Sequence, residues 1–142
     1  MKVVIQRCKK ASVEVDGKLI SKIDEGMLLL VGIGKGDTLE DVKRLAEKIL
    51  YLRIFSDEKG LMNKNINDVK GSILAISQFT LYADTKKGNR PSFLEAMPYK
   101  EAEVMFDEFV KYLQQYVPTY KGVFGADMQV SLINDGPVTI IL

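Results

Sequence analysis

The sequence predicts an α/β fold over residues 1–142: a single layered domain of mixed β-sheet with two main helices packed on it. Short alternating or apolar segments at both ends and in the middle of the chain indicate strands. Residues 39–49 and 99–116 repeat apolar side chains at spacings of three and four, which indicates two helices with one apolar stripe each. A helix of this kind buries its stripe, so both helices should pack on the sheet.

The first third of the chain predicts a hairpin and a central strand. Residues 3–6 alternate, and residues 12–15 and 18–23 flank an Asp16-Gly17 turn, so we expect three short strands here. Residues 26–33 are apolar without alternation, which is typical of a strand covered on both faces. This strand should therefore lie in the middle of the sheet.

The middle of the chain predicts the first helix and two further strands. Asp37 or Thr38 is expected to cap the helix, because either side chain can accept from its first free amides. Residues 54–55 and 72–79 predict strands, and the polar segment between them, residues 57–68, predicts a loop or ribbon.

The last third predicts the second helix and two closing strands. Pro98 and Pro118 bracket the helix, since proline is tolerated only at its ends. Residues 128–133 alternate and residues 138–142 are mostly apolar, so each predicts a strand, with a break at residues 134–137 between them.

Composition restricts the chemistry that this chain can perform. It has no histidine, no tryptophan and a single cysteine, Cys8, which we interpret as structural. The chain therefore lacks a histidine base, a thiol pair and a transition-metal ligand set, and we expect neither a metal nor a cofactor. Any catalysis must rest on backbone amides, hydroxyls and groups of the substrate.

Charge and hydropathy restrict the partners and the location. Residues 1–7 meet a charge too early for the apolar core of a signal peptide, and the longest apolar run, residues 27–31, is too short to span a bilayer. We therefore expect a cytoplasmic protein with no membrane partner. The net charge of +1 creates no overall field for nucleic acid, so we expect no DNA partner, and any RNA contact must come from a local cluster.

A glycine-rich segment, residues 32–36, follows one predicted strand and precedes a helix, where phosphate-binding loops occur. It lacks the Ser or Thr that a nucleotide-binding loop places after its lysine, because Gly36 follows Lys35. A tight strand-to-helix turn is the better interpretation, and a nucleotide-dependent enzyme remains the alternative.

Two basic clusters could contact RNA phosphates. Lys86, Lys87 and Arg90 surround Gly88 in a loop, and Arg7 lies with Lys9 and Lys10 near the N-terminus; a solvated surface is the ordinary interpretation of both. Flexible cations in a loop can follow an RNA backbone without a high net charge. A non-enzymatic RNA-binding or assembly domain that uses the first loop is therefore an alternative function.

Two further segments combine polar side chains or bare backbone with strand ends. Residues 77–81, Ser-Gln-Phe-Thr-Leu, could be a solvated edge strand, or a strand end whose amides point at a carbonyl oxygen. Residues 134–139, Asn-Asp-Gly-Pro-Val-Thr, could be an ordinary turn. Alternatively, because Gly136 has no Cβ and Pro137 has no N–H, the backbone carbonyls of this segment could accept from an ammonium group.

Taken together, these two segments resemble the signature pair of the D-aminoacyl-tRNA deacylases. The likeness covers essentially the whole chain, and Leu61 departs from a pattern in which Lys usually precedes Met-Asn. The supporting matches are Gln6-Arg7, Ala11 to Gly17, Arg53 to Phe55, Met62-Asn63, Gly88 to Phe93 and Phe124 to Met128.

The resemblance implies a deacylase-type fold assembled as a homodimer. It implies hydrolysis of the ester that links a D-amino acid, or wrongly attached glycine, to the terminal adenosine of tRNA. The released products are the free amino acid and tRNA, and L-aminoacyl groups are spared. A histidine is not needed, because the ester is already activated and the ribose 2′-hydroxyl is thought to take part in this family.

The resemblance also assigns roles to residues. The amides near Phe79 and Thr80 would receive the ester carbonyl oxygen, while Ser77 and Gln78 would shape the pocket. The Thr80 hydroxyl is the one candidate nucleophile, although positioning is favoured because no base is present to activate it. The resemblance further places Gly136 and Pro137, joined by a cis bond, in the partner's pocket. Arg7, at a position that matches the family, could anchor their loop electrostatically, although a surface cation is the plainer interpretation.

Overall fold

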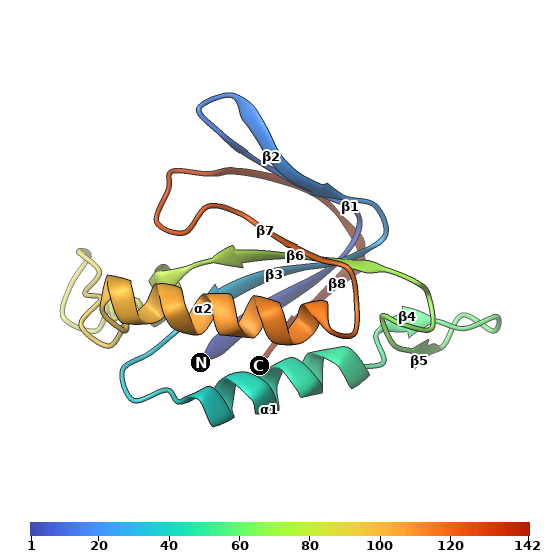
Figure 1. The fold of residues 1–142 in the computed structure, drawn as a ribbon, viewed down its shortest axis with the longest axis horizontal. Coiled ribbons are helices and arrows are strands. Elements are labelled where there is room, and N and C mark those ends of the chain that lie inside the picture. The colour runs from blue at the N-terminus through green and yellow to red at the C-terminus, as the bar shows by residue number, and fades with distance from the viewer.

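The structure, a computed structural model, describes residues 1–142 as eight strands, two α-helices and one 3-10 turn (Figure 1). Along the chain, the elements are β1 (Lys2–Val15), β2 (Lys18–Ile23), β3 (Gly26–Gly32), α1 (Leu39–Tyr51), β4 (Phe55–Ser56), β5 (Met62–Lys64), β6 (Ser72–Ser77), η1 (Phe79–Tyr82), α2 (Tyr99–Gln114), β7 (Thr119–Lys121) and β8 (Gln129–Ile141). The predicted α/β domain with a mixed sheet and two helices is confirmed.

Six strands form one sheet. Five of them follow the order β2-β1-β3-β6-β7, and the sixth, β8, also pairs with β1. Strands β3, β6 and β7 are parallel to one another, whereas β1 is antiparallel to β2, β3 and β8. The parallel connections are made by α1 and α2, which lie side by side on one face (Figure 1). The β4–β5 pair forms a separate ribbon.

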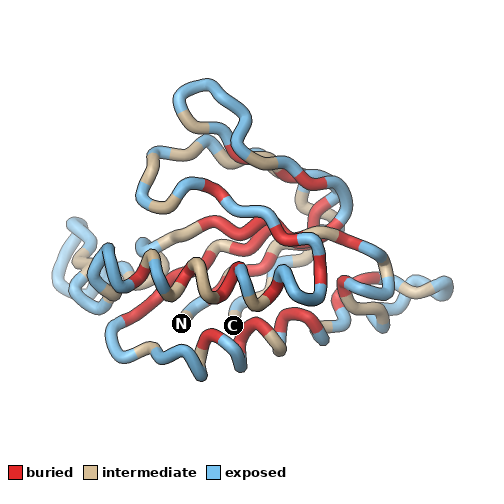
Figure 2. Tube along the Cα trace, in the orientation of Figure 1, coloured by how far each residue is buried: buried red, intermediate tan, exposed pale blue.

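The central strand β3 is buried on both faces, as its unbroken apolar sequence predicts. Its odd-numbered residues, such as Met27 and Leu29, belong to the large core beneath the helices. Leu28 belongs to a second core, which the outer half of β1, β2 and the start of β8 cover. Figure 2 shows both layers as buried segments on either side of the central strands.

Strand β1 reaches both cores because its pairing is irregular. Val3 and Ile5 contact the helix-side core, whereas Ala11 and Val13 contact the second core. The register with β8 shifts between Gln6 and Lys10, and an extra residue in a strand changes which face the following side chains occupy. The three short strands expected at the N-terminus are therefore wrong: β1 is one bent strand, and the hairpin to β2 through Asp16-Gly17 is confirmed.

The first helix begins as its sequence indicates. Thr38 is the N-cap, and its hydroxyl accepts from the Asp41 amide while the Asp41 carboxylate accepts from the Thr38 amide. The Thr38 hydroxyl also donates to the Asp41 carboxylate at 2.8 Å. This bond first, and then those from the Thr38 amide and the Arg44 side chain, lower the pKa of Asp41 to about 2. Asp37 is therefore not the cap.

Three boundaries differ from the sequence prediction. Strand β6 ends at Ser77, and residues 79–82 form η1 instead of continuing the strand. The last strand is continuous through Gly136 and Pro137, because the long β1 pairs with it on both sides of the irregularity. The short β7 was not predicted, and it pairs with residues 73–75 of β6 only. The solvated edge-strand interpretation of residues 77–81 is wrong because the chain leaves the sheet after Ser77 and forms η1.

No helix of the chain combines the length and the apolar character that crossing a membrane requires.

Candidate active site

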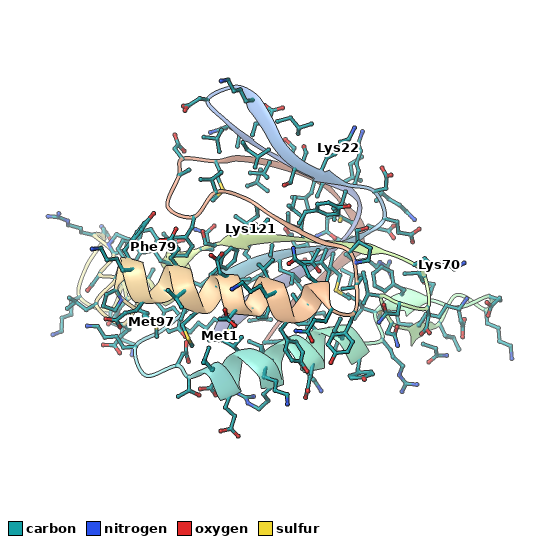
Figure 3. The ribbon with its side chains drawn as sticks, in the orientation of Figure 1. Met1, Lys22, Lys70, Phe79, Met97 and Lys121 are labelled. Carbon is teal, nitrogen blue, oxygen red and sulfur yellow. The ribbon has the colours of Figure 1, made fainter.

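A pocket of about 590 Å³ opens at the carboxyl ends of the parallel strands β3 and β6. Ligand sites in open α/β sheets commonly form at such ends, where the connections diverge. Most of the lining is apolar, and Ser77 and Gln78 supply polar side chains. Figure 3 shows Phe79 and Met97, which both line the pocket, at the end of the molecule opposite Lys70, which precedes β6.

Two consecutive backbone amides beside this pocket, those of Phe79, which lines it, and of Thr80, which follows, have no acceptor in the protein. The Gln78 amide still completes the sheet by donating to the Val31 carbonyl, at 2.8 Å. Phe79 and Thr80 then begin a 3-10 turn, whose first amides have no carbonyl behind them to accept. Neither amide donates to any backbone or side-chain group, so both can bind an external oxygen.

The Thr80 hydroxyl faces an amide donor and no base. It accepts a hydrogen bond from Gln78 Nε2, and no carboxylate or amine contacts it. A hydroxyl becomes a strong nucleophile only when an adjacent base removes its proton. The arrangement therefore favours the positioning role that was predicted for Thr80.

Aromatic side chains form the walls on either side. Phe79 is 57% exposed and meets Phe93 edge-on, with ring centroids 5.0 Å apart. Tyr99, at the start of α2, meets Phe124 edge-on at 5.1 Å, and its hydroxyl donates to the Phe124 carbonyl. Sequence reasoning did not assign Phe93, Tyr99 or Phe124 to the site. The signal was present, because Phe93 and Phe124 lie in segments that carry the family resemblance.

The Gly136-Pro137 bend lies against Arg7. The peptide bond between Gly136 and Pro137 is cis, and Gly136 has φ +126°. Arg7 Nε donates to the Asp135 carbonyl at 3.2 Å and pairs with the Asp135 carboxylate, while Arg7 Nη1 donates to the Ile54 carbonyl at 2.7 Å. Arg7 is only 9% exposed, so the plainer interpretation of it as a surface cation is wrong.

The two signature segments lie at opposite ends of the sheet within one chain. Arg7, beside the bend, pairs with Met27, whereas Ser77 pairs with Val31, four residues further along β3. This register separates them by about 13 Å along the strands, in addition to the strands between them. Neither Gly136 nor Pro137 lines the pocket. One chain therefore does not bring the two segments together.

The loop that carries Lys86, Lys87 and Arg90 connects two walls of the pocket. It leaves η1 and returns at Phe93, and the Asp84–Ser92 bridge closes its base. All three cations are exposed, and none of them forms an ion pair. The second cluster differs, because Arg7 and Lys9 both pair with Asp135.

The remaining polar chemistry is limited. Cys8 is fully buried, and this burial raises the pKa of its thiol to about 11, which suits the structural role predicted for it. No three side chains among Asp, Glu and Cys are grouped so that they could hold a metal ion.

The family model for D-Tyr-tRNA(Tyr) deacylase matches residues 4–142 of this sequence. The chain belongs to this family. Its members are hydrolases that act on D-aminoacyl-tRNA, and the deacylase described here therefore has the predicted enzyme class. The family assignment gives no support to the alternative interpretation of the glycine-rich turn, a nucleotide-dependent enzyme.

Two solved structures show the same fold. The deacylase is 44% identical to a protein titled "c-Myc DNA Unwinding Element Binding Protein", with a TM-score of 0.95 over 100% of this chain and 97% of that chain. A "probable eukaryotic D-amino acid tRNA deacylase" is 15% identical, with a TM-score of 0.81 over 99% of this chain and 97% of that one. The second likeness shows the fold alone.

Replacing Arg7 tests how firmly the bend is held. Arg7→Met leaves the Ile54 and Asp135 carbonyls without their donor, and we expect the free energy of unfolding to fall by about 2 kcal/mol. Urea denaturation of the deacylase measures this loss. Lys10→Met is the matched control, because Lys10 is exposed and makes no ion pair, and it should change stability by less than about 0.5 kcal/mol. Equal stability of the two variants would contradict the anchoring role of Arg7.

Proposed function

We propose that this deacylase hydrolyses the ester between a D-amino acid, or glycine, and the terminal adenosine of tRNA, and that it spares L-aminoacyl esters. The observation that carries the proposal is the pair of unpartnered amides of Phe79, which lines the apolar pocket, and of Thr80, the next residue. The family assignment supports the substrate class.

These amides suit the charge that ester hydrolysis creates. Water adds to the ester carbonyl carbon, and the carbonyl oxygen becomes an oxyanion that two N–H donors can stabilise. The intermediate collapses by breaking the bond to the ribose oxygen, which leaves with the proton that the water gives up. Donors that are already oriented in a partly dry pocket need no reorganisation as charge develops, so the reaction does not require a histidine.

The other side chains of the segment contribute position. Ser77 and Gln78 line the pocket, so they orient the adenosine and the scissile bond. The side-chain amide of Gln78 donates to the Thr80 hydroxyl and holds it near the free backbone amides of Phe79 and Thr80. The ribose 2′-hydroxyl of the substrate then directs the water, as the family resemblance implies.

The Gly136-Pro137 bend completes the pocket of a second copy in a homodimer. Within one chain the bend lies at the far end of the sheet from Ser77, so only another protomer could bring it to the reacting ester. Arg7, Ile54 and Asp135 hold the bend in place, which a wall that excludes side chains requires.

The backbone of the Gly136-Pro137 bend would explain why the enzyme accepts D-aminoacyl and spares L-aminoacyl groups. A carbonyl beside Pro137 can accept from the substrate α-ammonium, because proline offers no N–H of its own. An L side chain would point into this backbone, whereas a D side chain would point away, so selection works by exclusion. Glycine has no side chain to exclude, and glycyl-tRNA is therefore also a substrate.

The tRNA backbone contacts the loop of Lys86, Lys87 and Arg90. These cations have no acidic partner, and their loop begins and ends at the pocket walls. Such contacts supply affinity without reading sequence. A substrate of this kind places the activity in the cytoplasm.

The central test compares the two stereoisomers of one substrate. We expect the purified protein to hydrolyse D-tyrosyl-tRNA and to leave L-tyrosyl-tRNA intact, measured as release of labelled tyrosine. Equal rates on both would defeat the stereochemical part of the proposal. Binding of charged tRNA without turnover of either isomer would support the alternative, a non-enzymatic RNA-binding domain.

Removing the Thr80 hydroxyl tests whether it is a nucleophile. We expect Thr80→Ala to retain measurable turnover of D-tyrosyl-tRNA, because its backbone amide is unchanged; the rate should fall by about tenfold, in line with lost positioning. Thr85→Ala is the control, since Thr85 is an exposed loop residue outside the pocket lining. A folded but wholly inactive Thr80→Ala would instead favour attack by the hydroxyl.

Neutralising the basic loop tests its place in the interface. We expect Lys86→Gln with Lys87→Gln to reduce the slope of log affinity for tRNA against log salt concentration by about 1 to 2, because two phosphate contacts are lost. Binding to duplex DNA should be measured in the same titration, since a 44% identical relative is titled as a DNA-element binding protein. An unchanged slope would remove the loop from the tRNA interface, and tighter binding to DNA would favour that second ligand.

A further inference from the structure

The glycine-rich segment at residues 32–36 supports two walls of the pocket. It resembled a phosphate loop by position, but its surroundings in the structure are protein. The turn η1 packs on one side of it, and the segment Glu95–Met97 pairs with the other side.

On the η1 side, Gly32 and Gly34 lie so close to atoms of the turn that a larger side chain at either position would meet them. A Cβ on Gly34 would lie 2.5 Å from the Tyr82 ring, and one on Gly32 would lie 3.0 Å from both the Gln78 carbonyl oxygen and Leu81 Cβ. Distances below 3.0 Å do not occur between such atoms, so a side chain at Gly34 must displace the Tyr82 ring. Neither glycine has the positive φ that would explain it by backbone conformation.

Polar groups hold the same contact together. One oxygen of Asp37 accepts from the Gly34 amide at 2.6 Å and lies 3.5 Å from the Tyr82 hydroxyl, and its other oxygen pairs with the amino group of Met1. Lys2 Nζ donates to the Leu81 carbonyl at 3.2 Å and lies 4.5 Å from the centre of the Tyr82 ring. A cation at this position satisfies a carbonyl that the end of η1 leaves free.

On the other side, the glycine-rich segment forms backbone hydrogen bonds with residues 95–97. The Lys35 amide donates to the Glu95 carbonyl at 2.9 Å, and the Met97 amide donates to the Ile33 carbonyl at 2.9 Å. Ala96 and Met97 line the pocket. The turn is therefore fixed with respect to this wall, and η1 is fixed with respect to the turn.

We propose that Gly34 and Tyr82 are positioning residues for deacylation: their direct contact sets where η1 presents the Phe79 and Thr80 amides to the reacting carbonyl. This inference rests on the proposed role of those amides. Neither residue lines the pocket, so neither touches the substrate.

The contact between Gly34 and Tyr82 should affect the rate because the amide donors must be placed precisely with respect to the oxyanion. Donors stabilise an oxyanion when they lie about 2.7–3.1 Å from it, and a displacement of about 1 Å can cost roughly a hundredfold in rate. A Cβ on Gly34 would require about that much movement of the outer ring atoms of Tyr82, which belongs to the same turn as both amides. Because Lys2 and Asp37 contact this ring, we expect it to shift together with its turn and not to rotate away alone. Phe79 is the only residue of η1 that lines the pocket, so most of the substrate contacts lie on other elements and most of the loss should fall on the chemical step.

The test measures D-tyrosyl-tRNA hydrolysis by Gly34→Ala under steady-state conditions. We expect kcat to fall by roughly 10- to 100-fold while KM for the charged tRNA stays within about twofold. The amide resonances of Phe79 and Thr80 in a ¹H–¹⁵N spectrum should shift in the same variant, which reports the movement without any activity measurement.

Gly36→Ala is the matched control. Gly36 belongs to the same turn, has φ +86° and has no atom within 4 Å of an added Cβ, so it strains the backbone without contacting η1. We expect its kcat to remain within about twofold of the wild type, because the walls of the pocket do not move.

A second variant keeps the inference testable if Gly34→Ala does not fold. Tyr82→Leu removes the outer ring atoms that the new Cβ would meet, and it should lower kcat by roughly tenfold with KM unchanged. In the double variant the clash is absent, so we expect a kcat close to that of Tyr82→Leu and not the product of the two losses.

The outcomes separate the inference from the proposed function. A wild type that does not hydrolyse D-tyrosyl-tRNA would overturn the proposed function itself. An active wild type with unchanged kcat in folded Gly34→Ala or Tyr82→Leu would overturn only the positioning role. Losses that multiply in the double variant, or that Gly36→Ala reproduces, would also overturn it.

Discussion

The rest of the structure depends on the parallel pair β3–β6, which is buried on both faces. Helices cover one face, and the bent β1 with β2 and the start of β8 covers the other. Because neither strand can shift or turn over without exposing a core, the point where β6 leaves the sheet is fixed at Ser77. The amides that follow are consequently rigid, and they are also unpartnered.

This arrangement shows how a chain without histidine can support ester hydrolysis. The first amides of a short turn carry partial positive charge, and an apolar pocket limits the water that would screen it. The site therefore offers orientation and dipoles in place of a titrating side chain. The hydrogen bond from Gln78 to Thr80 has the same character, because it positions a hydroxyl without activating it.

On the proposed function, the location of the two signature segments would make assembly part of the site. Each chain presents an amide-lined pocket at one end of its sheet and a backbone wall at the other. Arg7 belongs to the second end, where it ties the bend to the base of the β4–β5 ribbon through the Ile54 carbonyl. A homodimer would give both ends a function at once, which accounts for a bend this firmly held and yet remote from the pocket of its own chain.

The glycines of residues 32–36 illustrate two different physical requirements within one turn. Gly36 adopts a positive φ, whereas Gly34 is small because Tyr82 occupies the space of a side chain. Sequence position after a strand and before a helix does not distinguish these cases from a phosphate loop. The distinction becomes visible only when the backbone conformation and the neighbours of each glycine are known.

The sequence by itself determined the fold class, both helices, the buried central strand and the family, since each depends on local periodicity or on motifs in order. It also determined that no histidine or thiol-pair chemistry is available. Tertiary structure decided that β6 ends at Ser77, where the chain turns into η1 and packs on Gly32 and Gly34 through contacts that no short window of sequence records. It likewise decided that Arg7 is buried against Asp135, and that Phe93, Tyr99 and Phe124 form the walls. These facts arise from residues far apart in the chain, so the physical reason is long-range packing, which local pattern does not encode.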